Sequence, residues 1–123
     1  MPRTTREVHL ESLDLAKRFV EVAADKLAAD ILLLDVRSLT TIADYFVICS
    51  GNSERQAQAI ARDVLDKAAA DGIKPLHDEG LTDSRWVLLD YGSVIVHVFT
   101  PAERDYYRLE RLWSRAVPVV RIQ

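Results

Sequence analysis

Two apolar runs that flank a Gly-Ser pair constrain the fold of this chain more than any other feature. The first run covers residues 86–91 and the second covers residues 94–99, with Gly92 and Ser93 between them. Runs rich in β-branched and aromatic residues around a two-residue turn with glycine first predict a tight β-hairpin. Since successive side chains in a strand point to opposite faces, the turn also determines which residues share a face.

The two faces of the predicted hairpin differ in chemistry. One is apolar apart from a single phenol and is expected to lie beneath helices; it consists of Val87, Leu89, Tyr91, Val94, Val96 and Val98. The other combines large apolar groups with an acid and an imidazole; it consists of Trp86, Leu88, Asp90, Ile95, His97 and Phe99. This mixed face is either a second, smaller core with a satisfied histidine or a partly exposed surface for a partner. Exposed aromatic groups with a polar rim are typical of interfaces.

The remaining elements are predicted from apolar periodicity and helix start signals. In chain order they are a helix over 12–29, strands over 31–36 and 45–49, a helix from 53 to 72, a strand near 73–77, the hairpin, and a last helix that opens at 100–103 and carries an apolar stripe of Ala102, Tyr106, Leu109, Trp113 and Ala116. Ser12 is the expected cap of the first helix, and Ser53 with Gln56 forms a capping box for the second. Thr100 followed by Pro101 marks the start of the last helix.

Chain length and composition restrict the class of protein. A chain of 123 residues suits one domain, and the order of elements predicts an α/β domain over residues 1–123 with three helices on a mixed sheet of about five strands. Residues 1–10 and 118–123 are expected to be loose tails. One cysteine excludes an internal disulfide framework, and no apolar run approaches the roughly 20 residues of a membrane span. With no apolar secretory segment at the N-terminus, a cytoplasmic protein is predicted.

Charge is distributed unevenly along the chain. The net charge of −3, from 16 basic and 19 acidic residues, argues against a protein whose main role is to coat nucleic acid. Residues 71–90 hold five acids against two basic residues, and this rim beside Trp86 suits a basic partner protein, although a solvated acidic loop is the plainer interpretation. The last predicted helix carries four arginines in one stripe: Arg104, Arg108, Arg111 and Arg115. The usual explanation of such a stripe is a polar surface face, and a contact with RNA or an acidic neighbour is the less common one.

Candidate catalytic groups are sparse. The three histidines and Cys49 show none of the close paired spacings of a metal site, and Cys49 is expected to be an inert buried thiol unless His97 lies beside it. Residues 50–53 join a strand to a helix, as in nucleotidyltransferases of the polymerase-beta type. The pair of carboxylates that those enzymes need for two metal ions is missing, because Asp90 stands alone. We therefore predict no enzyme, no metal and no cofactor.

Several sequence blocks stand in the order and spacing of a known family. They are residues 42–56, Glu79-Gly80, residues 86–92, residues 96–99, and Arg104 and Tyr107 with residues 109–113. These blocks resemble the iojap family, whose bacterial members are the ribosomal silencing factors RsfS, and they cover about residues 12–114. The resemblance implies a nucleotidyltransferase-like α/β fold without the catalytic carboxylates.

The resemblance also implies a function and a partner. Members of this family bind large-subunit ribosomal protein uL-fourteen and sterically block association with the small subunit, which represses translation. The alternatives are a large-subunit assembly factor, a nucleotide-binding transferase-like enzyme and a direct RNA-binding module. Family members are seen as dimers, so a homodimer of the free protein is compatible with the resemblance, as is a peripheral contact with rRNA. The absence of a transit-like segment points to the bacterial form.

The resemblance and the residue pattern meet at the mixed hairpin face. The tryptophan of the family's Trp-x-Leu-x-Asp-Tyr-Gly block, here Trp86, is associated with the contact to the ribosomal protein. We predict that Trp86 is a desolvated anchor, because aromatic residues dominate the binding energy of many interfaces. Acidic residues of the rim are expected to meet basic groups of the partner; they are Glu79, Asp83 and Asp90. The other predicted partner-binding residues are Leu88, His97, Arg104 and Tyr107.

Overall fold

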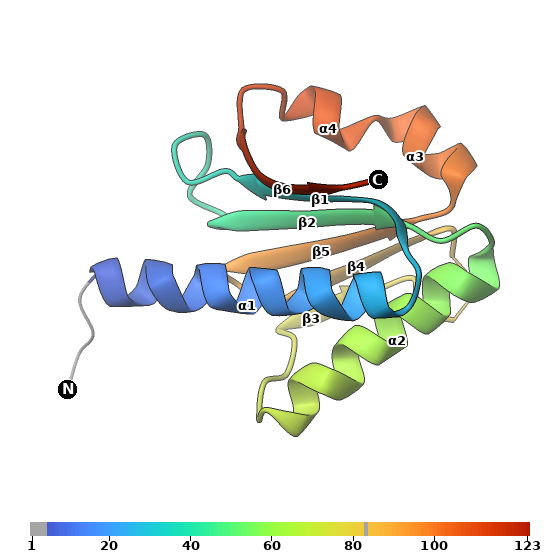
Figure 1. The fold of residues 1–123 in the computed structure, drawn as a ribbon, viewed down its shortest axis with the longest axis horizontal. Helices are drawn as coiled ribbons and strands as arrows, with labels where there is room; N and C mark the ends of the chain where they lie inside the picture. The colour runs from blue at the N-terminus through green and yellow to red at the C-terminus, as the bar shows by residue number, and fades with distance from the viewer. Residues whose placement is uncertain (1–4, 83) are drawn as a thin grey trace.

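A computed structural model describes residues 5–82 and 84–123 as helices on one mixed sheet (Figure 1). The elements are α1 (Thr5–Asp25), β1 (Ala29–Asp35), β2 (Tyr45–Ser50), α2 (Glu54–Ala70), β3 (His77–Glu79), β4 (Trp86–Asp90), β5 (Val94–Phe99), α3 (Pro101–Tyr107), α4 (Leu109–Leu112) and β6 (Val117–Ile122). The strands lie in the order β3-β4-β5-β2-β1-β6. Only β2 and β5 pair in parallel; the other neighbours are antiparallel. The predicted mixed α/β fold is confirmed.

Helices lie on both faces of the sheet. Figure 1 shows α1 and α2 on one side and α3 and α4 on the other. The larger core lies beneath α1 and α2, and the apolar hairpin face contributes to it as predicted. The smaller core lies beneath α3 and α4 and includes Phe46, Ile48, Ile95 and Phe99. No helix in the described ranges is long and apolar enough to cross a bilayer.

The hairpin of β4 and β5 has the predicted register. Leu89 pairs with Val96, and the backbone N–H of Tyr91 donates to the carbonyl of Val94 at 2.9 Å. Gly92 has a φ of 84°, a left-handed conformation that glycine adopts without a steric penalty. The turn therefore determines which side chains point into each core.

The start of α2 follows the predicted capping box with a small shift. The hydroxyl of Ser53 accepts from the backbone N–H of Gln56 at 3.1 Å, while the amide oxygen of Gln56 accepts from the N–H of Asn52 at 2.6 Å. Immediately before, a Cβ on Gly51 would lie 2.6 Å from the backbone nitrogen of Ala57. Only glycine therefore lets β2 pass into α2 at this distance.

The predicted ends of the chain need correction. The first helix begins at Thr5, so Ser12 is a buried residue within α1 and not its cap. It ends at Asp25, short of the predicted residue 29, and Leu27 takes a left-handed φ of 60° and is 81% exposed. Residues 1–4 lie outside the described residues.

The C-terminal segment is a strand and not a loose tail. β6 pairs with β1 along an edge that would otherwise leave its backbone groups unpaired, and the β-branched residues of this segment favour an extended chain. Pro118 is tolerated because an edge strand needs hydrogen bonds on one side only. The strand predicted near 73–77 is likewise displaced, to β3 at His77–Glu79.

The last predicted helix is broken. Arg108 adopts a left-handed conformation with φ 48° and ψ 52°, which ends α3 and begins α4. Within α3, before the break, Tyr106 is 79% exposed, and Tyr107 contacts Trp86 instead, contrary to the predicted stripe. A left-handed non-glycine residue costs about 1–2 kcal/mol, so burial of Leu109 and the packing of Trp113 must outweigh it. Thr100 caps α3 through its backbone position without a side-chain bond.

Candidate functional site

Aromatic rings gather where β4 meets α3. Trp86 stacks on Phe99 with ring centroids 4.8 Å apart and contacts Tyr107 of α3 at 4.7 Å. Trp86 is half-buried at the margin of the smaller core, and Tyr107 is 42% exposed. The mixed face is therefore divided between a buried part and an exposed part. Its inner residues form a second core, while its outer margin presents aromatic rings to solvent.

His97 lies beneath this margin and supports it. The indole Nε1–H of Trp86 donates to Nδ1 of His97 at 3.2 Å, and the edge of Phe46 packs against the imidazole at 5.2 Å. His97 is only 5% exposed, and this burial lowers its pKa to about 4. The imidazole is therefore neutral at pH 7 and orients Trp86 from below, where a partner would not reach it.

Glutamates surround a hollow beside Trp86. The hollow has a volume of about 570 Å³, and its acidic lining comes from Glu54, Glu79 and Glu103. Arg85 is the cation in that lining; its guanidinium lies 3.3 Å from a carboxylate oxygen of Glu54 and 4.0 Å from one of Glu103. Glu54 and Glu103 thus share one guanidinium, and Glu79 does not contact it, so the lining holds three carboxylates and one cation and is attractive to a further cation.

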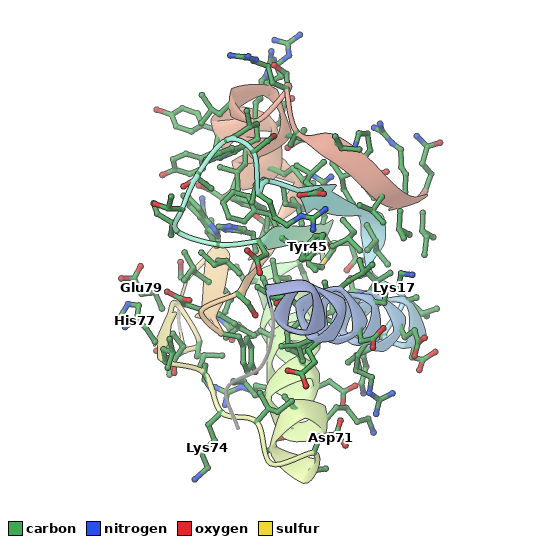
Figure 2. All side chains as sticks on the ribbon, turned by 90° about the vertical axis from the view of Figure 1, so that its left-hand side faces the viewer. Lys17, Tyr45, Asp71, Lys74, His77 and Glu79 are labelled. Carbon is green, nitrogen blue, oxygen red and sulfur yellow. The ribbon has the colours of Figure 1, made fainter. Side chains whose placement is uncertain are left out.

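Glu79 stands at the outer edge of the sheet beside His77. Figure 2 shows the two side chains next to each other, and Nε2 of His77 lies 2.9 Å from Oε1 of Glu79. This hydrogen bond to Glu79 raises the pKa of His77. Along the sheet, Glu79 pairs with Leu88 and Leu88 pairs with His97, so the three side chains share one face.

Four of the predicted partner-binding residues come together. We call the group formed by Trp86, Leu88, Tyr107 and Glu79 the Trp86 surface; all four line the same hollow. Glu54 and Glu103 belong to the hollow but were absent from the predicted set. Their positions depend on which strands pair and where those strands end, and no local sequence pattern indicates either. Asp83 lies outside the described residues.

Asp90 and Arg104 do not line the hollow beside Trp86, although both belong to the predicted partner-binding set. Asp90 is at the opposite end of β4, where its Oδ1 accepts from the backbone N–H of Gly92 at 2.7 Å and holds the turn. The side chain of Arg104 is 11% exposed, donates to Oγ of Ser50 at 3.0 Å and pairs with Glu110 at 3.3 Å. The four arginines do not form one stripe on a continuous helix: Arg104, Arg108 and Arg111 line a second hollow across the break, whereas Arg115 follows the end of α4 and is not in that lining.

The arrangement around Cys49 bears on catalysis. Cys49 pairs with Val98 and points into the larger core, whereas His97 points into the smaller core on the other face. Burial raises the pKa of the Cys49 thiol to about 12, so no thiolate forms near pH 7. In the part of the chain that the structure describes, no group of three or more His, Cys, Asp or Glu residues is placed to hold a metal ion.

Comparisons with known proteins agree with the blocks quoted above. Residues 9–123 match the family model "Ribosomal silencing factor during starvation". The ribosomal silencing factor RsfS of Bacillus subtilis is 50% identical over 104 residues, which cover 81% of this chain and 88% of that protein. The RsfS of Halalkalibacterium halodurans is 42% identical over 114 residues, covering 93% and 97%. A crystal structure of a Chromobacterium violaceum protein superposes with a TM-score of 0.80 at 37% identity, covering 83% of this chain and 85% of the other. The resemblance to the iojap and RsfS proteins is thereby confirmed, and the chain belongs to the ribosomal silencing factor family.

Proposed function

We propose that this protein binds the large ribosomal subunit through ribosomal protein uL-fourteen and prevents the small subunit from joining, which lowers translation. The names of its relatives support a ribosome-associated silencing role. The observation that carries the finer proposal is the Trp86 surface, in which half-buried aromatic rings border a hollow lined by three glutamates. Such a surface suits a basic partner protein better than a phosphate backbone.

The Trp86 surface has the physical properties of an interface centre. Phe99 stacks against Trp86 from one side and His97 accepts its indole N–H, so the ring is already oriented before a partner arrives. A preoriented aromatic anchor loses little conformational entropy on binding. A lysine or arginine of the partner that enters the hollow would meet Glu79 and the faces of two aromatic rings, which attract cations.

We further propose that the protein acts without catalysis. Asp90 lies at the hairpin, where a nucleotidyltransferase would need a pair of metal-binding carboxylates. Its carboxylate instead accepts a hydrogen bond from the backbone N–H of Gly92 and stabilises the turn. Cys49 is buried, protonated and on the opposite face from His97. A protein that covers the docking surface of the small subunit needs no chemistry to compete with it. Because it binds the free large subunit and not the joined ribosome, it shifts the joining equilibrium toward free subunits by mass action.

Added protein is expected to reduce the fraction of joined ribosomes. Purified large and small subunits are mixed at moderate magnesium with increasing amounts of the protein and separated on sucrose gradients. The protein should travel with the large subunit and not with the small one, and the joined peak should fall as the protein saturates. An unchanged profile at saturating protein would contradict the proposed function.

Reversal of the Glu79 charge is expected to weaken binding to the large subunit about three- to tenfold, mainly by slowing association. Glu79 is exposed, so Glu79→Lys should leave the fold intact. Asp66→Lys is the matched control, because Asp66 is an exposed acid on α2 away from the hollow. Titration of labelled protein against large subunits measures both variants. Equal losses for the two would mean that net charge matters and the hollow does not.

A further inference from the structure

The C-terminal part of the chain differs in charge from the rest. Residues 100–123 carry five arginines and no lysine against three acids, a net charge of +2, whereas the preceding 99 residues carry 11 basic and 16 acidic residues, a net charge of −5. These 24 residues form α3, α4 and β6, which lie next to each other on one side of the molecule (Figure 1). A basic surface therefore stands on a protein that is acidic elsewhere.

The basic segment borders a hollow at the end of the parallel strand pair. β2 and β5 end together at Ser50 and Phe99, but β2 continues into α2 on one face of the sheet and β5 into α3 on the other. Crevices at such a switch point, beyond the carboxyl ends of parallel strands, are the usual ligand sites of open α/β sheets. Here the crevice has a volume of about 620 Å³, and its cationic lining is Arg104, Arg108, Arg111 and Arg121.

Two of these arginines are already engaged within the protein. Arg104 pairs with Glu110 and bonds Ser50, and Arg108 donates to the carbonyl of Asp105 at 3.0 Å and lies 3.8 Å from its carboxylate. Their charges are largely balanced by these partners. Their role is to hold the wall of the hollow, where Arg104 ties α3 to the end of β2.

The other two arginines are available. Arg111 of α4 and Arg121 of β6 are exposed, and within the described ranges their guanidinium groups form no hydrogen bond or ion pair. Of the acids that line the hollow, Asp105 and Glu110 already face arginines, which leaves Asp30 as the remaining negative charge. Two free guanidinium groups at one opening suit phosphate oxygens, which they bind in a bidentate geometry.

We propose that Arg111 and Arg121 contact the phosphate backbone of ribosomal RNA when the protein is seated on the large subunit, an inference that rests on the proposed function. The hollow is close to the Trp86 surface, because Trp86 pairs with Phe99 and Phe99 pairs with Ser50 on three successive strands, and adjacent strands lie about 4.8 Å apart. One side of α3 therefore faces the protein partner and the other faces the RNA. The acidic remainder of the chain disfavours RNA binding without that partner.

The salt dependence of binding tests the RNA contact. The affinity for isolated large subunits is measured between 50 and 300 mM KCl (concentrations on the order of the physiological range) for wild type and for Arg111→Gln/Arg121→Gln. Lys17→Gln/Lys67→Gln is the matched control, since it removes the same charge from exposed positions on α1 and α2; Figure 2 labels Lys17. The affinity for isolated uL-fourteen is measured in parallel.

The arginine variant should bind large subunits at least about fivefold more weakly, and the slope of log K against log[salt] should fall by about 1.5, the value for two lost phosphate contacts. Its affinity for isolated uL-fourteen should remain within about twofold of wild type. A slope equal to that of the lysine control, or an equal loss of affinity for uL-fourteen, would overturn the RNA contact and leave the proposed function standing. Failure of the wild-type protein to bind large subunits would overturn both.

Discussion

Trp86→Ala is expected to weaken binding to the large subunit about 30-fold or more, the effect of losing about 2 kcal/mol at an interface hot spot. The indole is half-buried, stacked on Phe99 and aligned by His97, so the alanine variant loses both contact area and orientation. Binding is measured at a temperature well below the melting transition of the variant, so that the folded fraction is near one. An unchanged affinity would remove Trp86 from the proposed site and leave the glutamate-lined hollow as the better candidate.

The same substitution has a cost in stability that must be separated from binding. A fully buried tryptophan replaced by alanine loses about 3–5 kcal/mol and an exposed one less than about 1 kcal/mol. Because Trp86 is half-buried, we expect an intermediate loss of about 2 kcal/mol. Trp113→Ala is the matched control, since Trp113 is also half-buried in the smaller core, against Phe46 at 5.0 Å, but does not line the hollow. It should melt earlier and still bind.

Stability is expected to fall by about 3 kcal/mol as the pH drops from 7 to 4 through His97 alone. The folded protein holds the imidazole pKa at about 4, against 6.5 for an unperturbed histidine, because protonation would place a charge inside the smaller core. Between these values the unfolded chain binds a proton that the folded chain does not, so the free energy of unfolding decreases by about 1.4 kcal/mol per pH unit. The contribution is complete above pH 6.5 and levels off below pH 4.

Urea denaturation at a series of pH values measures this slope. His97→Phe keeps an aromatic ring in the smaller core and removes the titration, so its free energy of unfolding should vary less between pH 4 and 6.5 than that of wild type. Titration of the His97 imidazole in the wild-type protein by NMR measures its pKa directly, without the variant. An imidazole that titrates near pH 6.5 in the folded protein would contradict the prediction.

The hairpin and α2 could be predicted because their signals are local. Alternating apolar residues and Gly92 determine the register of β4 and β5, and Ser53 with Gln56 determines where α2 begins. In both cases the residues that decide the structure are within a few positions of each other. Tertiary contacts therefore did not change the structure that these local signals predict.

The structure of the C-terminal region could not be predicted because it depends on contacts with residues far away in the sequence. The helix breaks at Arg108 so that Leu109 and Trp113 reach the smaller core, and nothing in the helical pattern indicates where that core lies. β6 requires the free edge of β1, which is known only once the strand order is known. The hollow beside Trp86 has the same origin, since Glu54 and Glu103 are brought together by the parallel pairing of β2 with β5.

That parallel pairing also governs how the chain can assemble. Tyr45 pairs with Val94, 49 positions later, whereas β4 and β5 are joined by a two-residue turn and β1 lies next to β2 in the chain. Local pairings close short loops quickly, and the entropic cost of a long loop slows the distant one. We therefore expect two small antiparallel units to form first and to dock along the β2–β5 seam last. The hollow beside Trp86 combines Glu54, which follows β2, with Glu79 and Glu103 from the β5 side, and the arginine hollow combines Ser50 of β2 with Arg104 of α3. A chain that has not completed docking therefore has neither hollow in its final arrangement.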